Sequence, residues 1–239
     1  MSSPVGTDAL SVLLMLADGR MPAGGHAHSG GLEEAVSGRA HDEQSLTGYL
    51  QGRLATSGAM EAALAVAAWT IGRQTPVGSF LLLAQEAAAR VPSPAQRAAS
   101  SAQGRALCRA AGQIWPGASC EVLDALSRDV PEGLLLPVAG GAIAAALGMN
   151  AYQVATWSLY GTVTAPAWAA TRLLGMAPYA VCRSIAALNG EICRMAQQAS
   201  RTGHGRALDF AEDLPAGGAP LSEIGAEAHS IWEVRMFAS

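Results

Sequence analysis

The sequence predicts an all-α fold: a single-domain helical bundle of about ten helices with a C-terminal tail. Three observations support this prediction. Half of the 239 residues are apolar, alanine is the most frequent residue, and aromatic residues make up only 5%, a balance that favours helices over sheet. Nearly every periodic stretch repeats its apolar residues at helical spacing. We find no internal repeat and no break in composition, so residues 1–239 are expected to form one domain.

Local signals place the helices of the first half. Leucines from Leu10 to Leu16 predict a first helix that Thr7 or Asp8 can cap, and Asp42 begins a later one. Gly58 is expected to break that helix, and the apolar stretch after it is expected to resume as a buried helix. Helices are predicted over residues 8–18, 32–36, 42–58, 59–71, 79–90, 95–115 and 120–128.

The stretch from Gly133 to Thr171 contains no charged residue. A segment of about 20 apolar residues could span a membrane, and a helical membrane component is one alternative reading. Pro137 interrupts the first half, however, and no basic flanks set an orientation. We therefore expect two helices buried in the core, over residues 137–147 and 151–174, with Pro166 kinking or splitting the second.

The end of the chain combines a loop, two helices and an unusual tail. Helices are predicted over residues 178–200 and 221–229, and the Gly-, Asp- and Pro-rich stretch 203–220 between them is expected to be a mobile loop. The tail 230–239 is apolar and contains Trp232 and Phe237, whereas chain ends are usually polar and frayed. Such an end either packs onto its own domain or docks on another protein, and both readings stay open.

Composition excludes several functional classes. The net charge of −4 gives no electrostatic reason to expect nucleic acid or an anionic membrane as a partner. All fifteen basic residues are arginine, so the glycine-rich loop 24–31 is not a P-loop, which needs a lysine. The four cysteines lack C-x-x-C spacing and no secretory signal precedes them, which favours reduced thiols and a cytoplasmic protein. No set of Ser, His and Asp residues can be assembled into a catalytic triad from the sequence.

The glycine-rich loop also carries a histidine pair, His26 and His28, in front of Glu33 and Glu34. Neutral imidazole suits Ni²⁺, but two ligands are too few for a tight site unless a carboxylate or a second subunit completes it. The alternatives are ordinary loop histidines and a metal-dependent enzyme that uses His26, His28 and Glu33. We predict a weak or transit metal site and no tightly bound cofactor.

Several segments together resemble the UreF family of urease accessory proteins. The family signature, Leu-Pro-x-Gly-(Gly/Ala)-Phe-Ser-(Tyr/Trp)-Ser-x-Gly-Leu-Glu, corresponds here to residues 21–33, with histidine at positions 26 and 28 where the family has aromatic residues. The similarity continues through residues 104–109, the uncharged region 137–172 and the tail 233–239, and so covers nearly the whole chain.

The resemblance implies an all-α protein without catalytic residues of its own. UreF-like proteins form a homodimer that sits between UreD (also called UreH) and the GTPase UreG. The complex delivers Ni²⁺ to apo-urease, and UreF is thought to modulate the GTPase and to contribute part of a passage for the metal.

The resemblance also suggests partner-binding residues. Glu33 matches the glutamate of the family signature, and Arg235 matches the arginine of the family's tail, beside the aromatic Trp232 and Phe237. Any lysine that serves the family in GTPase regulation is absent from this chain. An arginine such as Arg172 or Arg183 could replace it as a charge, but not as an equivalent donor.

Overall fold

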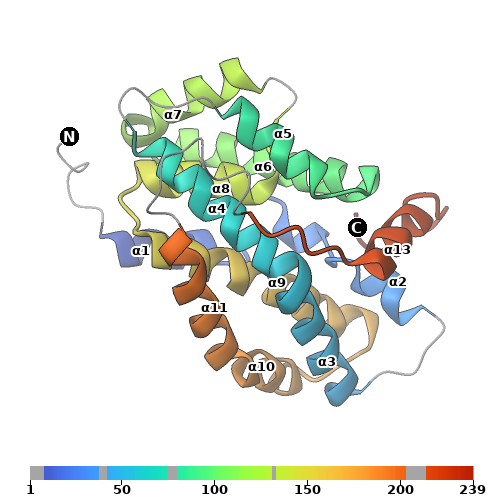
Figure 1. Cartoon of the computed structure of the whole chain (residues 1–239). Helices are drawn as coiled ribbons and strands as arrows, with labels where there is room; N and C mark the ends of the chain where they lie inside the picture. Colours follow the sequence, from blue (N-terminus) through green and yellow to red (C-terminus); the bar gives the residue numbers. More distant parts are fainter. Residues whose placement is uncertain (1–7, 38–41, 75–79, 131–132, 203–213, 239) are drawn as a thin grey trace.

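The computed structural model describes residues 8–37, 42–74, 80–130, 133–202 and 214–238. Every regular element within these ranges is helical, which confirms the all-α prediction, and the helices pack as one bundle around α4, α8 and α9 (Figure 1). Most of the loop expected at residues 203–220 lies outside the described residues. Residues 214–219 are described and contain no helix until α13 begins at Pro220.

The first helices begin where their capping residues predict. Helix α1 (Ala9–Ala17) is capped by Asp8, whose side chain accepts a hydrogen bond from the Leu10 amide. Helix α2 (Leu32–Val36) follows the short 3₁₀ turn η1 (Gly25–Ala27). Asp42 and Ser45 form a reciprocal capping box at the start of α3 (Glu43–Arg53).

The predicted break at Gly58 is wrong. Helix α3, the π-helical turn η2 (Leu54–Gly58) and α4 (Ala59–Gly72) run on as one continuous helix. A Cβ atom at Gly58 would lie 3.2 Å from the carbonyl oxygen of Arg53 and 3.4 Å from Cγ2 of Thr162 on α9. The tightest contact of such an atom is thus with the carbonyl of Arg53, at the start of the π-helical turn, and this turn keeps the helix continuous at that point.

The later helices follow the predictions with three differences. The predicted helix 178–200 is two helices, which Leu188 separates. Pro166 lies inside α9, and that helix is not split. The helix predicted from Cys120 begins earlier, at Pro116, in a favourable first-turn position for proline. The elements are α5 (Leu81–Ala89), α6 (Pro94–Ile114), α7 (Pro116–Asp129), α8 (Leu136–Ala146), α9 (Ala151–Leu173), α10 (Pro178–Ala187), α11 (Asn189–Thr202) and α13 (Pro220–Ser230).

Small residues set the distance between the core helices. A Cβ atom at Gly141 of α8 would lie 2.0 Å from the carbonyl oxygen of Ala65 on α4, and one at Gly140 would lie 2.0 Å from the ring of Trp157 on α9. Both glycines are buried, as are most residues of α8 and α9. The uncharged stretch is thus the packed centre of the bundle, as expected for core helices.

Among the described residues, one helix, Glu43–Gly72, is long and apolar enough to cross a membrane. Within its most apolar window, 61% of the residues are buried inside the protein. A buried core helix meets the same criterion, so this helix is weak support for the membrane alternative.

Candidate functional site

The carboxylate of Glu33 joins the N-terminal motif to the C-terminal tail. Glu33 lies in the first turn of α2, after Gly31, which has a φ of 85°, and its own amide donates to Oγ of the buried Ser29 (3.3 Å). Oε1 of Glu33 accepts from the amide of Met236 (2.8 Å), and Oε2 accepts from the amide of Phe237 (3.0 Å). The start of α2 is therefore tied directly to the backbone of the tail.

A buried histidine completes the partners of this carboxylate. Nε2 of His229, at the end of α13, lies 2.9 Å from Oε2 of Glu33, and the His229 side chain is only 3% exposed. Burial alone would raise the pKa of Glu33, but hydrogen bonds from the Met236 amide, His229 and the Phe237 amide together lower it below its ordinary value. Glu33 is therefore an ionised acceptor that three groups of the C-terminal segment share.

The aromatic residues of the tail pack against the same site. Phe237 is 5% exposed, and the guanidinium of Arg172, in the last turn of α9, lies 4.6 Å from its ring centroid in a cation–π contact. The ring centroids of Trp232 and His229 are 4.9 Å apart. Beyond Phe237, the amide of Ala238 donates to the carbonyl of Ala27 (2.7 Å).

The structure brings together most of the residues predicted to bind partners. Glu33, Arg172 and Phe237 meet at one point, Trp232 reaches the same point through His229, and Arg235 lies on the tail with its side chain exposed. The tail therefore packs onto its own domain with one face. Its other face stays exposed, with Ile231 and Val234 83% and 86% exposed. Whether any of these residues contacts a partner stays a prediction.

Helix α13 is held in place by a second carboxylate. Oε1 of Glu227 accepts from the Ala95 amide in the first turn of α6 (2.9 Å) and from the hydroxyl of Ser93. The site favours a carboxylate because the amides at a helix N-terminus carry partial positive charge. Gly225 lies directly against Glu34 of α2, where a Cβ atom would be 2.2 Å from the carboxylate oxygen. Helix α13 is thereby fixed between α2 and α6.

Neither His229 nor Glu227 was predicted from the sequence. Both lie on one short helix, and their partners Glu33 and Ser93 are 196 and 134 positions away. The only local signal was the spacing of His229 and Trp232, because residues three apart share one side of a helix end.

Two side chains of α3 hold the glycine-rich loop in place through hydrogen bonds. The carbonyl of Gly30, whose φ is 60°, accepts from the hydroxyl of Tyr49 (2.9 Å) and from Nη1 of Arg53 (2.7 Å). A Cβ atom at Gly30 would lie 3.3 Å from Pro166. Glycine is therefore needed here both for the positive φ and for the close approach to α9.

His26 and His28 lie in this loop, one outside and one inside. His26 is exposed, and His28 is half-buried; burial, and to a smaller extent the nearby His26, lower the pKa of His28 below its ordinary value. The neutral imidazole that results is the form that binds metals. In the described part of the chain, no group of three or more His, Cys, Asp or Glu residues is arranged to hold a metal ion. Glu33, expected as a third ligand, faces His229 and the tail.

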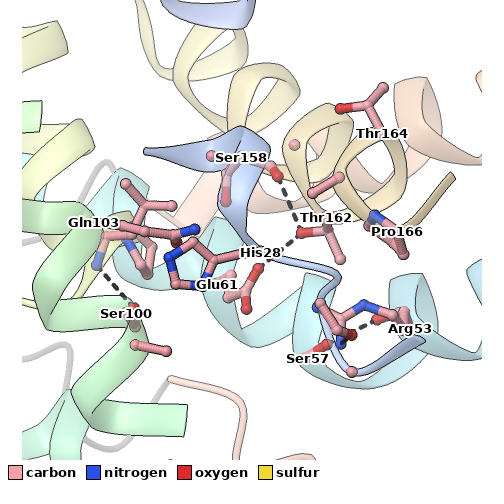
Figure 2. A pocket seen from close by; sticks show the side chains of 18 of the residues that line it. His28, Arg53, Ser57, Glu61, Ser100, Gln103, Ser158, Thr162, Thr164 and Pro166 are labelled. Atoms are coloured by element: carbon pink, nitrogen blue, oxygen red, sulfur yellow. Dashed lines mark hydrogen bonds between the residues drawn. The ribbon is translucent and has the colours of Figure 1, made fainter. Parts of the chain in front are cut away.

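His28 borders a cavity of about 740 Å³ at the centre of this arrangement. Figure 2 shows His28 between α4, α6 and α9, beside Glu61, Gln103 and Ser158. The hydroxyl of Thr162 lies 2.8 Å from Oε2 of Glu61 and 3.0 Å from the carbonyl oxygen of Ser158. The volume falls in the range of small-molecule sites, and the lining offers imidazole, carboxylate, amide and hydroxyl groups.

Comparison with known proteins gives one consistent result. Residues 40–189 match the UreF family model. The chain is 36% identical to a urease accessory protein UreF from Mycobacterium sp. strain JLS, over 96% of this chain and 99% of that protein. It is 37% identical to the UreF of Mycolicibacterium vanbaalenii over 97% and 99%, and 40% identical to that of Mycobacterium marinum over 71% and 75%.

Proposed function

This chain belongs to the UreF family of urease accessory proteins, and we propose that it acts as a non-catalytic assembly factor in nickel insertion. In this proposal a homodimer of the chain, in the cytoplasm, bridges UreD/UreH and the GTPase UreG. The complex delivers Ni²⁺ to apo-urease and the chain modulates the GTPase.

The observation that supports the proposal most is the seated tail. The signature residue Glu33 binds the backbone of a tail whose other face exposes Ile231, Val234 and Arg235. Large apolar side chains that are exposed together are typical of protein interaction surfaces. In this proposal, the carboxylate of Glu33 holds the tail so that its outer face is presented for docking.

The two arginines predicted for this role differ in their surroundings. Arg172 is stacked on Phe237 when the tail is seated, whereas the side chain of Arg235 is exposed. We therefore assign the direct contact with a partner to Arg235. Arg172 acts on the partner only through the position of the tail.

Nickel is the cargo of this assembly, and the chain offers a path for it. His26 at the surface and the neutral His28 on the cavity are suited to brief ligation of Ni²⁺, and Glu61 lines the same cavity. Two imidazoles and one carboxylate would hold the ion weakly, which suits a transfer site better than a resident one.

Co-purification tests the assembly role. The chain would be co-expressed with the UreD-type and UreG-type proteins of the same source, and complexes measured by chromatography with light scattering. We expect a defined complex with the wild type and none with a chain ending at Ser230. Val234→Asp should also abolish the complex, because it places a charge on the proposed docking face of the tail. Residue 234 is 86% exposed, so this substitution can be made without unfolding the domain.

The matched control is Tyr179→Asp. Tyr179 is 82% exposed, but it lies in the first turn of α10, far from the tail in the sequence. This variant should form the complex normally. The proposed docking surface would be refuted if the wild-type chain binds neither protein, or if Val234→Asp and Tyr179→Asp reduce complex formation equally.

A further inference from the structure

The C-terminal segment forms one wall of the cavity. Residues of this segment that line the cavity are Gly217, Ala219, Ser222, Ala226, His229 and Phe237. The remaining walls come from the glycine-rich loop and from α4, α6 and α9. The cavity is partly open even with this segment seated. We infer that the segment 214–238 is a strap that covers one side of the cavity and limits access to it, and that the pair Glu33–His229 is the latch that holds the strap in place.

The strap is attached mainly by polar contacts to carboxylates. Glu33 binds the Met236 and Phe237 amides and His229, and Glu227 of the strap binds the start of α6. The large apolar side chains of the strap that are buried are few, chiefly Leu214 and Phe237. An element with little buried apolar surface opens at low free energy compared with the bundle core. The carboxylate contacts therefore decide how often the cavity opens.

Opening the strap would change the cavity in two ways. It would expose interior groups of the lining such as Ser158, which is 8% exposed. It would also break the hydrogen bond from Ala238 to Ala27, the residue between His26 and His28. The latch thereby couples access to the cavity with the conformation of the histidine loop.

The outward face of the strap suggests what controls the latch. Leu221, Ile224, Ile231 and Val234 are exposed on it, while Ala226, His229 and Phe237 face inward. A protein docked on the outward face would hold the strap in place. This last step alone rests on the proposed function; the covering of the cavity by the strap does not.

Thiol labelling of the full chain tests the latch. Ser158→Cys places a small thiol on the cavity wall, and its reaction with a maleimide would be followed by peptide mass spectrometry. The exposed Cys182 in the same molecule reports reagent reactivity. We expect Glu33→Ala and His229→Ala each to speed labelling at position 158 by about tenfold or more, because each removes hydrogen bonds to a charged acceptor.

A second reporter separates opening of the cavity from unfolding. Ser184 is 1% exposed on α10 and does not line the cavity, so the labelling of Ser184→Cys follows global unfolding. Its rate should rise much less in the latch variants than the rate at position 158. Unchanged labelling at position 158, or equal acceleration at 158 and 184, would overturn the inference.

Addition of the UreD-type partner to the Ser158→Cys chain provides a separate test. Slower labelling would support docking on the outward face. Unchanged labelling, with acceleration in the latch variants, would refute the docking step and leave the strap standing.

Discussion

Replacement of Glu33 by alanine should release the tail while the bundle stays folded. The carboxylate accepts from two backbone amides and contacts the buried His229. Hydrogen bonds to charged groups are worth about 1.5–3 kcal/mol each. They are not additive, and the released amides can bind water, so we expect the free energy of tail seating to fall by about 2–4 kcal/mol. Global stability should fall less, because the tail lies at the edge of the bundle.

Hydrogen exchange measures this loss directly. The amides of Met236, Phe237 and Ala238 are all hydrogen-bonded in the seated tail. A loss of about 2 kcal/mol speeds their exchange by about 30-fold, which mass spectrometry of a peptide covering residues 231–239 would resolve. The control is Glu43→Gln, since Glu43 forms an exposed ion pair with Arg183, and such surface pairs contribute little to stability. Full protection of the tail in Glu33→Ala would refute the reasoning.

Three further outcomes follow from the geometry. The folded-state pKa of Glu33 is lowered, so the contribution of Glu33 to tail seating is fully present above the ordinary value of 4.5 and is lost as the pH falls through the lowered pKa. The protection of the tail amides, relative to their intrinsic exchange rate at each pH, should therefore fall in acid more in the wild type than in Glu33→Gln. Gly141→Ala should lower the free energy of unfolding, measured by chemical denaturation, by about 2–3 kcal/mol, because its Cβ would meet the Ala65 carbonyl. Gly48 has open space around it, so Gly48→Ala should stabilise α3 by up to about 1 kcal/mol. Equal effects of the two substitutions would contradict the packing argument. His28→Ala should weaken Ni²⁺ binding in titration calorimetry more than Gln44→Ala does, and identical isotherms would remove the histidine loop from the nickel path.

Local chemistry made the helices predictable. Asp8 and Asp42 accept amide hydrogen bonds at the positions where the sequence expects caps. Gly58 misled because it lies in a π-helical turn, where a Cβ atom would approach the carbonyl of Arg53 and the helix continues past the glycine. The separation of α10 from α11 at Leu188 was missed although Asn189 and Gly190, a pair typical of turns, follow it directly.

The candidate site was less predictable, because its parts come from distant segments. Glu33 and His229 are 196 positions apart, and no periodicity within either segment reports the other. The resemblance to UreF identified Glu33, Arg235 and the tail, but not what Glu33 binds. The sequence left two fates open for the tail, and the structure shows the inward face seated while the outward face stays exposed.

The contrast between the two ends of the bundle has a consequence for its response to hydrostatic pressure. Where α8 meets α4, Gly141 leaves no space between the backbones, so this contact is nearly incompressible. The cavity of about 740 Å³ is instead partly open to solvent. Pressure drives water into incompletely filled space, so compression should open the strap before it separates α4 from α8. Pressure thus offers a way to populate the open form of the unmodified chain.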